Sequence, residues 1–149
     1  MRAVIQRVDH AGVIVNHQEI SSIKAGIVVL LGIERDDTRS SADYILDKSI
    51  NLRIFEDNEG KMNRSLMDID GEMLVVSQFT LLGDCIKGRR PSFIRAEEPL
   101  KANELYEYFI QEAQKKVKYL ATGKFQEMMR IELVNNGPVT ILLDSRKTF

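Results

Sequence analysis

The sequence has 149 residues, 44% of them hydrophobic, which suits one domain with a sizeable buried core. The 21 Lys and Arg residues nearly balance 22 Asp and Glu residues, so a polyanionic partner would have to meet a local basic patch. The only cysteine, Cys85, excludes an intrachain disulfide framework and a multi-cysteine zinc site, and no apolar run approaches the ~20 residues of a membrane helix. We therefore expect a single soluble domain, residues 1–149, in the cytoplasm.

The first third of the chain predicts β-structure followed by one helix. Branched residues alternate through 1–8, and the polar residues 16–18 are typical of a hairpin turn. The run 26–33 is continuously apolar, which indicates a strand covered on both faces. A helix over 40–51 follows, capped by a serine, and its buried face is expected to contain Ala42, Ile45, Leu46, Ser49 and Ile50.

The middle of the chain predicts extended segments and a long loop. Residues 52–55 are expected to be extended, and 57–60 have the composition of a turn. Residues 72–77 predict a buried strand, since they are almost all apolar and follow an Asp-Gly turn. Residues 83–95 contain glycine and proline among charged residues, and we expect them to form a loop.

The last third predicts a second helix and a final pair of strands. Pro99 suits a first helical turn, and apolar spacing predicts a helix to about Tyr119, with Leu105, Tyr108, Phe109, Ala113, Val117 and Leu120 on one side. Residues 125–129 predict a further helical turn. Strands over 131–134 and 139–143 are expected to be separated by a break at Asn-Asn-Gly-Pro.

Several common catalytic signatures are missing from the sequence. His10 and His17 are the only histidines, and neither belongs to an HExxH or comparable ligand spacing. The sequence also contains no GxSxG elbow, no Walker-type phosphate loop and no GxGxxG opening a helix. We therefore expect no metal site and no cofactor.

Three features remain as candidates for function: the SQFT motif (residues 77–80), the basic loop (residues 87–95) and the NNGP motif (residues 135–138). Four cations without an acid in the basic loop suit phosphate contacts, although an ordinary solvated loop would have the same composition. In the SQFT motif a hydroxyl nucleophile would need a nearby base, which the sequence does not offer. Backbone N–H groups at the strand end are the alternative, because they can stabilise an oxyanion without an ionisable side chain.

Five segments together resemble the D-aminoacyl-tRNA deacylases, also called D-tyrosyl-tRNA deacylases. They occur in the family's order over essentially the whole chain, at the family's length. The segments are residues 3–8 (AVIQRV), 60–63 (GKMN), 77–81 (SQFTL), 90–93 (RPSF) and 135–140 (NNGPVT).

The resemblance implies an α/β fold, with a barrel-like, largely antiparallel or mixed β-sheet core and flanking helices, in a homodimer whose active site lies at the subunit interface. It implies hydrolysis of the ester of D-aminoacyl-tRNA, and of glycine mischarged on tRNA, as chiral proofreading in translation quality control. The implied catalytic pocket residues are Ser77, Gln78, Phe79 and Thr80, with the Phe79 N–H as oxyanion donor. The implied residues for substrate selection are Gly137 and Pro138, as a Gly-cis-Pro element from the partner subunit, with Asn135 and Arg7.

We further expect tRNA phosphates to be contacted by the cations of the basic loop, which are Lys87, Arg89, Arg90 and Arg95. The chemistry is expected to rely on backbone groups and on the 2′-OH of the terminal tRNA ribose. Two alternatives stay open at this point. One is a non-catalytic RNA-binding module of the same fold, and the other is a hydrolase of a different activated ester or amide.

Overall fold

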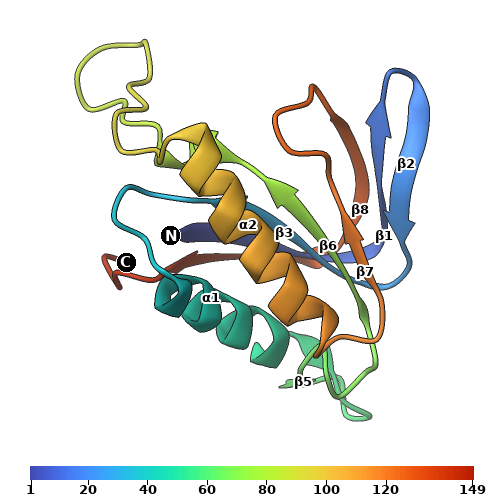
Figure 1. Ribbon diagram of the computed structural model, residues 1–149. Coiled ribbons are helices and arrows are strands. Elements are labelled where there is room, and N and C mark those ends of the chain that lie inside the picture. The colour runs from blue at the N-terminus through green and yellow to red at the C-terminus, as the bar shows by residue number, and fades with distance from the viewer.

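Two helices cover one side of a strongly curved mixed β-sheet (Figure 1). The computed structural model describes residues 1–149, and no helix in it is both long and apolar enough to cross a membrane. The strands are β1 (Arg2–Val15), β2 (Gln18–Ile23), β3 (Gly26–Gly32), β4 (Phe55–Glu56), β5 (Met62–Arg64), β6 (Glu72–Ser77), β7 (Leu120–Thr122) and β8 (Arg130–Asp144). The helices are α1 (Arg39–Asn51), the short 3-10 helix η1 (Phe79–Leu82) and α2 (Pro99–Gln114).

The main sheet has the strand order β2-β1-β3-β6-β7, and β8 pairs with β1. The 14-residue β1 is antiparallel to β3 through its first half, to β2 through its second half, and to β8 along most of its length. The pairs β3–β6 and β6–β7 are parallel. Ser21 Oγ of β2 donates a 2.7 Å hydrogen bond to Thr122 O of β7, so the two ends of the sheet meet and nearly close a barrel. The expected α/β fold with a barrel-like mixed sheet is confirmed.

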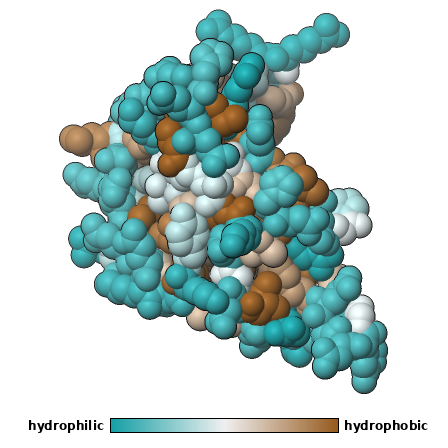
Figure 2. All heavy atoms as spheres, turned by 90° about the vertical axis from the view of Figure 1, so that its right-hand side faces the viewer, coloured by the Kyte–Doolittle hydropathy of each residue, from teal (hydrophilic) through white to brown (hydrophobic).

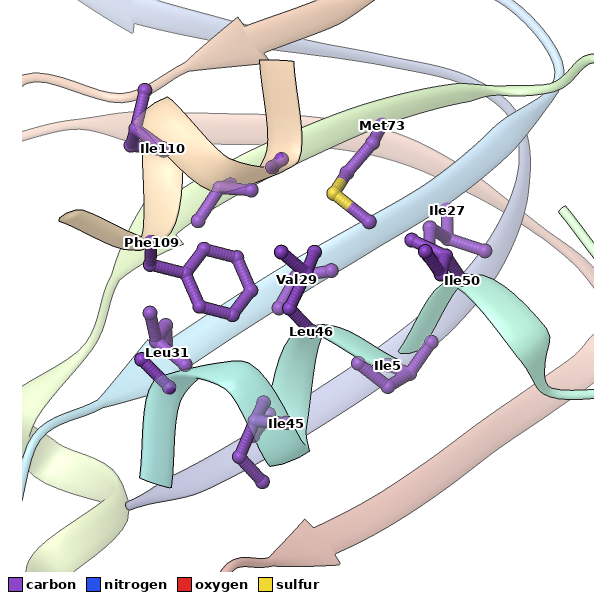
Figure 3. Close-up of a cluster of buried hydrophobic side chains, with 14 of the residues drawn as sticks. Ile5, Ile27, Val29, Leu31, Ile45, Leu46, Ile50, Met73, Phe109 and Ile110 are labelled. Carbon is purple, nitrogen blue, oxygen red and sulfur yellow. The ribbon is translucent and has the colours of Figure 1, made fainter. Parts of the chain in front are cut away.

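The larger hydrophobic core lies between the sheet and the two helices (Figure 3). Helix α1 buries all five predicted positions, and α2 places Phe109 against the sheet with no exposed surface. Alternate residues of β3, namely Ile27, Val29 and Leu31, face this core. A smaller core lies on the other side of the sheet and includes Val28, Leu74 and Val76. The prediction of a strand covered on both faces at 26–33 is therefore confirmed.

The predicted end of the second helix is wrong. Helix α2 ends at Gln114, and Leu120 belongs to β7, where it pairs with Met73 of β6. The apolar spacing predicts a longer helix because Val117 and Leu120 continue it. Val117 is buried just after the helix, however, and Leu120 packs on the same core from a strand. Tyr108 is only half-buried, and its hydroxyl donates to Asp43 Oδ1 at 2.9 Å.

Two further local predictions are wrong near the C-terminus. Residues 125–129 form no helical turn, because the chain makes a single hydrogen-bonded turn, with Glu127 N donating to Lys124 O, and then enters β8. The NNGP motif does not split the last strand in two. β8 runs continuously from Arg130 to Asp144, because β1 keeps pairing with it on both sides of the motif.

Replacing Phe109 with alanine should lower the free energy of unfolding by about 3–5 kcal/mol, because a fully buried aromatic ring leaves a cavity. Leu100→Ala on the same helix is the control, since Leu100 is 80% exposed and should change stability by no more than about 0.5 kcal/mol. Urea denaturation of both variants measures the difference. Similar losses in the two variants would contradict the core assignment.

Candidate active site

The SQFT motif lies where β6 leaves the sheet. Ser77 pairs with Leu31 of β3, and Gln78 N donates to Leu31 O at 2.7 Å. The chain then turns into η1, so that Ser77 and Gln78 are half-buried while Phe79 and Thr80 are exposed. The N–H groups of Phe79 and Thr80 open this short helix, where the first amides have no acceptor within the helix. The motif therefore presents backbone donors at the carboxyl end of a buried strand.

The side chains of the motif contact each other and the basic loop. The Gln78 side-chain amide donates to the Thr80 hydroxyl, and neither Ser77 nor Thr80 has a hydrogen bond to an ionisable side chain. The Phe79 ring is 57% exposed and packs edge-on against Phe93, with the ring centroids 5.1 Å apart. The arrangement gives the hydroxyls no general base, which favours the backbone as the chemically active part of the motif.

The NNGP motif forms a large bulge in β8. Gln6 of β1 pairs with Thr140 and Val8 pairs with Asn135, so that β1 offers only Arg7 opposite the segment 136–139, which we call the β8 bulge. The Gly137–Pro138 peptide bond is cis, Gly137 has a φ of +118°, and both residues are exposed. The bulge thus turns backbone out of the sheet at a fixed place.

Two side chains hold the β8 bulge in place. The buried Arg7 donates from Nε to Asn136 O at 3.1 Å and from Nη1 to Ile54 O at 2.6 Å. Asn135 accepts from Val139 N at 3.0 Å and donates to Gln6 Oε1 at 3.0 Å. The Asn136 carbonyl and the Val139 N–H of the bulge therefore have partners within the chain although the regular ladder is interrupted.

The SQFT motif and the β8 bulge lie at different places along β1 within one chain. Arg2 Nη1 donates to Leu81 O of η1 at 3.3 Å, whereas the bulge is opposite Arg7. Five residues of strand span roughly 16 Å at ~3.3 Å per residue. The two motifs of one chain are therefore well separated along β1.

The basic loop projects from the domain between β6 and α2 (Figure 1). Lys87, Arg89 and Arg90 are exposed, and their side chains form no hydrogen bond or ion pair. Arg95 differs, because its guanidinium contacts the Glu34 carboxylate, with Nη2 2.5 Å from Oε1. Three of the four cations expected to bind phosphates are thus free, and the fourth is already paired.

A surface hollow of about 650 Å³ lies away from both motifs and is lined by Asp57, Asn58, Glu59, Asn63 and Arg64. Hydrogen bonds from the Asn63 side chain, at 2.7 Å, and from Lys61 N lower the pKa of the Asp57 carboxyl below its usual value. The family-like segment 60–63 therefore stabilises its own turn. No group of three or more His, Cys, Asp or Glu side chains is arranged to hold a metal ion.

Comparison with known proteins identifies the family. A family model described as D-Tyr-tRNA(Tyr) deacylase matches residues 4–144. A D-aminoacyl-tRNA deacylase of Syntrophus aciditrophicus (strain SB) is 62% identical over 149 residues, which cover all of both chains. The chain belongs to the D-aminoacyl-tRNA deacylase family. This deacylase is therefore a hydrolase, and the family's substrate is an aminoacyl-tRNA.

Further relatives of the deacylase agree in sequence and fold. A D-aminoacyl-tRNA deacylase of Clostridioides difficile (strain 630) is 57% identical over 149 residues and the full length of both chains. A solved structure named c-Myc DNA Unwinding Element Binding Protein is 41% identical, with a TM-score of 0.92 over 97% of this chain and 98% of that chain. A probable eukaryotic D-amino acid tRNA deacylase, 18% identical with a TM-score of 0.80 over 95% and 97% of the two chains, shows the fold alone.

Sequence reasoning missed two residues around the deacylase motifs. Ile54 supplies the carbonyl that fixes Arg7, and Glu34 holds Arg95. A backbone carbonyl leaves no signal in the sequence. Glu34 is an acid directly after the apolar run 26–33, a position that is equally typical of the polar end of a strand.

Alanine at Gly137 should destabilise the deacylase more than alanine at Gly60, by about 1–3 kcal/mol. A Cβ at Gly137 would lie 2.7 Å from Arg7 Nη2 and 2.9 Å from Val139 Cγ2, whereas one at Gly60 would meet nothing within 4 Å, and both glycines have positive φ. The comparison of the two variants in urea thus measures the crowding around Gly137 by Arg7 and Val139. Equal losses would mean that these two residues do not pack tightly around the bulge.

Proposed function

We propose that the deacylase removes D-amino acids, and glycine mischarged on tRNA, at a pocket built from two subunits of a homodimer. The SQFT motif of one subunit would bind the ester, and the β8 bulge of the partner would select the amino acid. The observation that carries the proposal is the separation of these two motifs along β1. Each motif presents exposed backbone, and a second copy would bring the motif of one subunit beside that of the other.

The free edge and face of β8 suit such a dimer. β8 pairs only with β1, so its other edge is open to a partner. Leu142 is 59% exposed and Val134 is 43% exposed on this strand. Figure 2 shows the side of the molecule where β8 and the β1–β2 hairpin lie, with hydrophobic areas among the hydrophilic surface. Burial of such apolar surface would favour association.

The chemistry needs little from ionisable side chains. An aminoacyl ester is already activated, so a positioned water, a held carbonyl and a stabilised oxyanion are the main requirements. One well-placed oxyanion donor contributes about 10²–10³ in rate, and the Phe79 N–H is the proposed donor. The 2′-OH of the terminal ribose would assist the attacking water, which fits a site whose hydroxyls lack a basic partner.

Selection of the D-enantiomer would work by exclusion. Backbone carbonyls of Gly137 and Pro138 would occupy the space that an L side chain needs, while a D side chain would point outward. Arg7 and Asn135 hold this backbone in place through the hydrogen bonds described above. Because the side chain itself is not bound tightly, the enzyme would accept many D-amino acids.

The acceptor end of the tRNA would be bound by the basic loop. Lys87, Arg89 and Arg90 are free to contact phosphates. Such contacts would make binding sensitive to salt and nearly independent of the RNA sequence. The protein has a formal net charge of -1, so this local patch, rather than an overall field, would attract the RNA. Such a reaction belongs in the cytoplasm, where charged tRNAs are used.

A non-catalytic nucleic-acid-binding role is the second candidate. It is favoured by the projecting basic loop and by the name of the 41%-identical structure, which describes binding to a DNA element.

Deacylation assays with matched D- and L-aminoacyl-tRNA separate the candidates. The proposal expects release of the D-amino acid and of glycine, with the L-aminoacyl ester left intact. Binding of both tRNAs without release would support the non-catalytic module. Release from both enantiomers at similar rates would contradict the selection by the β8 bulge.

The role of Thr80 has its own test. Thr80→Ala should keep kcat within about tenfold of wild type, because loss of a true nucleophile costs several orders of magnitude more. Ser77→Ala serves as the matched control for loss of a hydroxyl. A substrate whose terminal ribose lacks the 2′-OH should react far more slowly with all three proteins. Normal turnover of that substrate would contradict the assistance by RNA.

A further inference from the structure

Glu34 is a buried acid at the base of the basic loop. It lies two residues after the end of β3, is 2% exposed, and accepts through Oε1 from Arg95 Nε at 2.7 Å. Its second oxygen, Oε2, lies 3.4 Å from Arg146 Nε and has no hydrogen bond. Burial of a carboxylate costs free energy unless cations pair with it, and Arg95 and Arg146 are the cations beside Glu34. Removal of the Glu34 charge would therefore deprive Arg95 of its ionic partner.

The backbone around this ion pair joins the loop base to the segment after β3. Arg35 N donates to Arg95 O at 2.9 Å, and Glu97 N donates to Ile33 O at 3.0 Å. Within the loop base, Ala96 N donates to Phe93 O at 2.9 Å. The position of Phe93 therefore depends on the same few residues that the Glu34–Arg95 pair holds.

Phe93 is the part of this assembly that contacts the SQFT motif. Its ring lies edge-on to Phe79 at 5.1 Å between centroids, and a Cβ added at Gly83 would come within 3.1 Å of it. Phe79 is more than half exposed, and the Phe93 ring is the aromatic side chain that packs against it. A shift of the loop base would move the residue whose N–H is the proposed oxyanion donor.

We propose that Glu34 and Arg95 are positioning residues for deacylation, which set the place of Phe93 and through it the SQFT turn. The inference rests on the proposed function of that turn. It assigns Arg95 a different role from Lys87, Arg89 and Arg90, since its guanidinium is engaged with Glu34.

The competing role for Arg95 is direct phosphate binding. The Glu34→Gln variant distinguishes this role from the positioning role. This substitution keeps the side-chain shape, leaves Arg95 in the chain, and raises the formal net charge from -1 to 0. If Arg95 binds phosphate, Glu34→Gln frees it and should bind tRNA as well as wild type or better. If the pair positions the turn, Glu34→Gln and Arg95→Gln should have the same defect.

The experiment measures kcat/KM on D-aminoacyl-tRNA, the Kd for uncharged tRNA, and backbone amide exchange at Arg35 and Glu97. Glu34→Gln and Arg95→Gln should each lower kcat/KM by roughly ten- to a hundred-fold, because small displacements of a reacting group are costly. Their double variant should be no worse than either alone. Amide exchange at the loop base should rise in both, while the Kd changes little. Glu59→Gln, which breaks an exposed pair with Lys61, is the control and should match wild type.

Wild-type kcat/KM in Glu34→Gln, or raised amide exchange without loss of activity, would overturn the positioning role. A defect in Kd and salt dependence confined to Arg95→Gln would also overturn it in favour of phosphate binding. If Glu34→Gln does not fold, Arg95→Gln decides through its kcat, since Arg95 is 46% exposed in its side chain. Failure of the wild-type protein to deacylate any D-aminoacyl-tRNA would instead refute the proposed function, and the amide exchange would still report on the loop base.

Discussion

The pairing of β1 with three other strands is the constraint on which the rest of the structure depends. One edge of this strand pairs first with β3 and then with β2, and the other edge pairs with β8. Through the same strand, Arg2 contacts the turn after β6 and Arg7 contacts the β8 bulge. Because both cores pack against this sheet, the two motifs are held at a fixed separation along it.

In the two-subunit site proposed above, that separation would let a deacylase work with few ionisable groups. The SQFT motif presents backbone N–H groups, and Arg7 and Asn135 hold two backbone atoms of the β8 bulge, the Asn136 carbonyl and the Val139 N–H. Backbone dipoles need no proton transfer and cost no reorganisation when they are fixed in advance. In the proposed dimer, an activated ester would meet the donors of one subunit and the selecting carbonyls of the other.

Much of the fold could be predicted from sequence, because periodicity records burial. The buried face of α1 and the doubly covered β3 were visible in the apolar pattern. The end of α2 could not be predicted, because Leu120 continues the helical spacing of apolar residues although it lies in the strand β7. Within the site, the sequence indicated the SQFT and NNGP motifs through their residue types. It could not indicate the ion pair of Arg95, because its partner Glu34 is 61 residues away in the chain.

The most direct test of the two-subunit site uses a purified heterodimer. One subunit carries Phe79→Pro, which removes the proposed N–H donor. The other carries Gly137→Ala, which is expected to weaken rejection of L-amino acids. Only one SQFT motif is then functional, and across the interface it meets the intact bulge. The heterodimer should therefore hydrolyse D-aminoacyl-tRNA and spare the L-form. Hydrolysis of the L-form, as in the Gly137→Ala homodimer, would show that each chain uses its own bulge and would contradict the account.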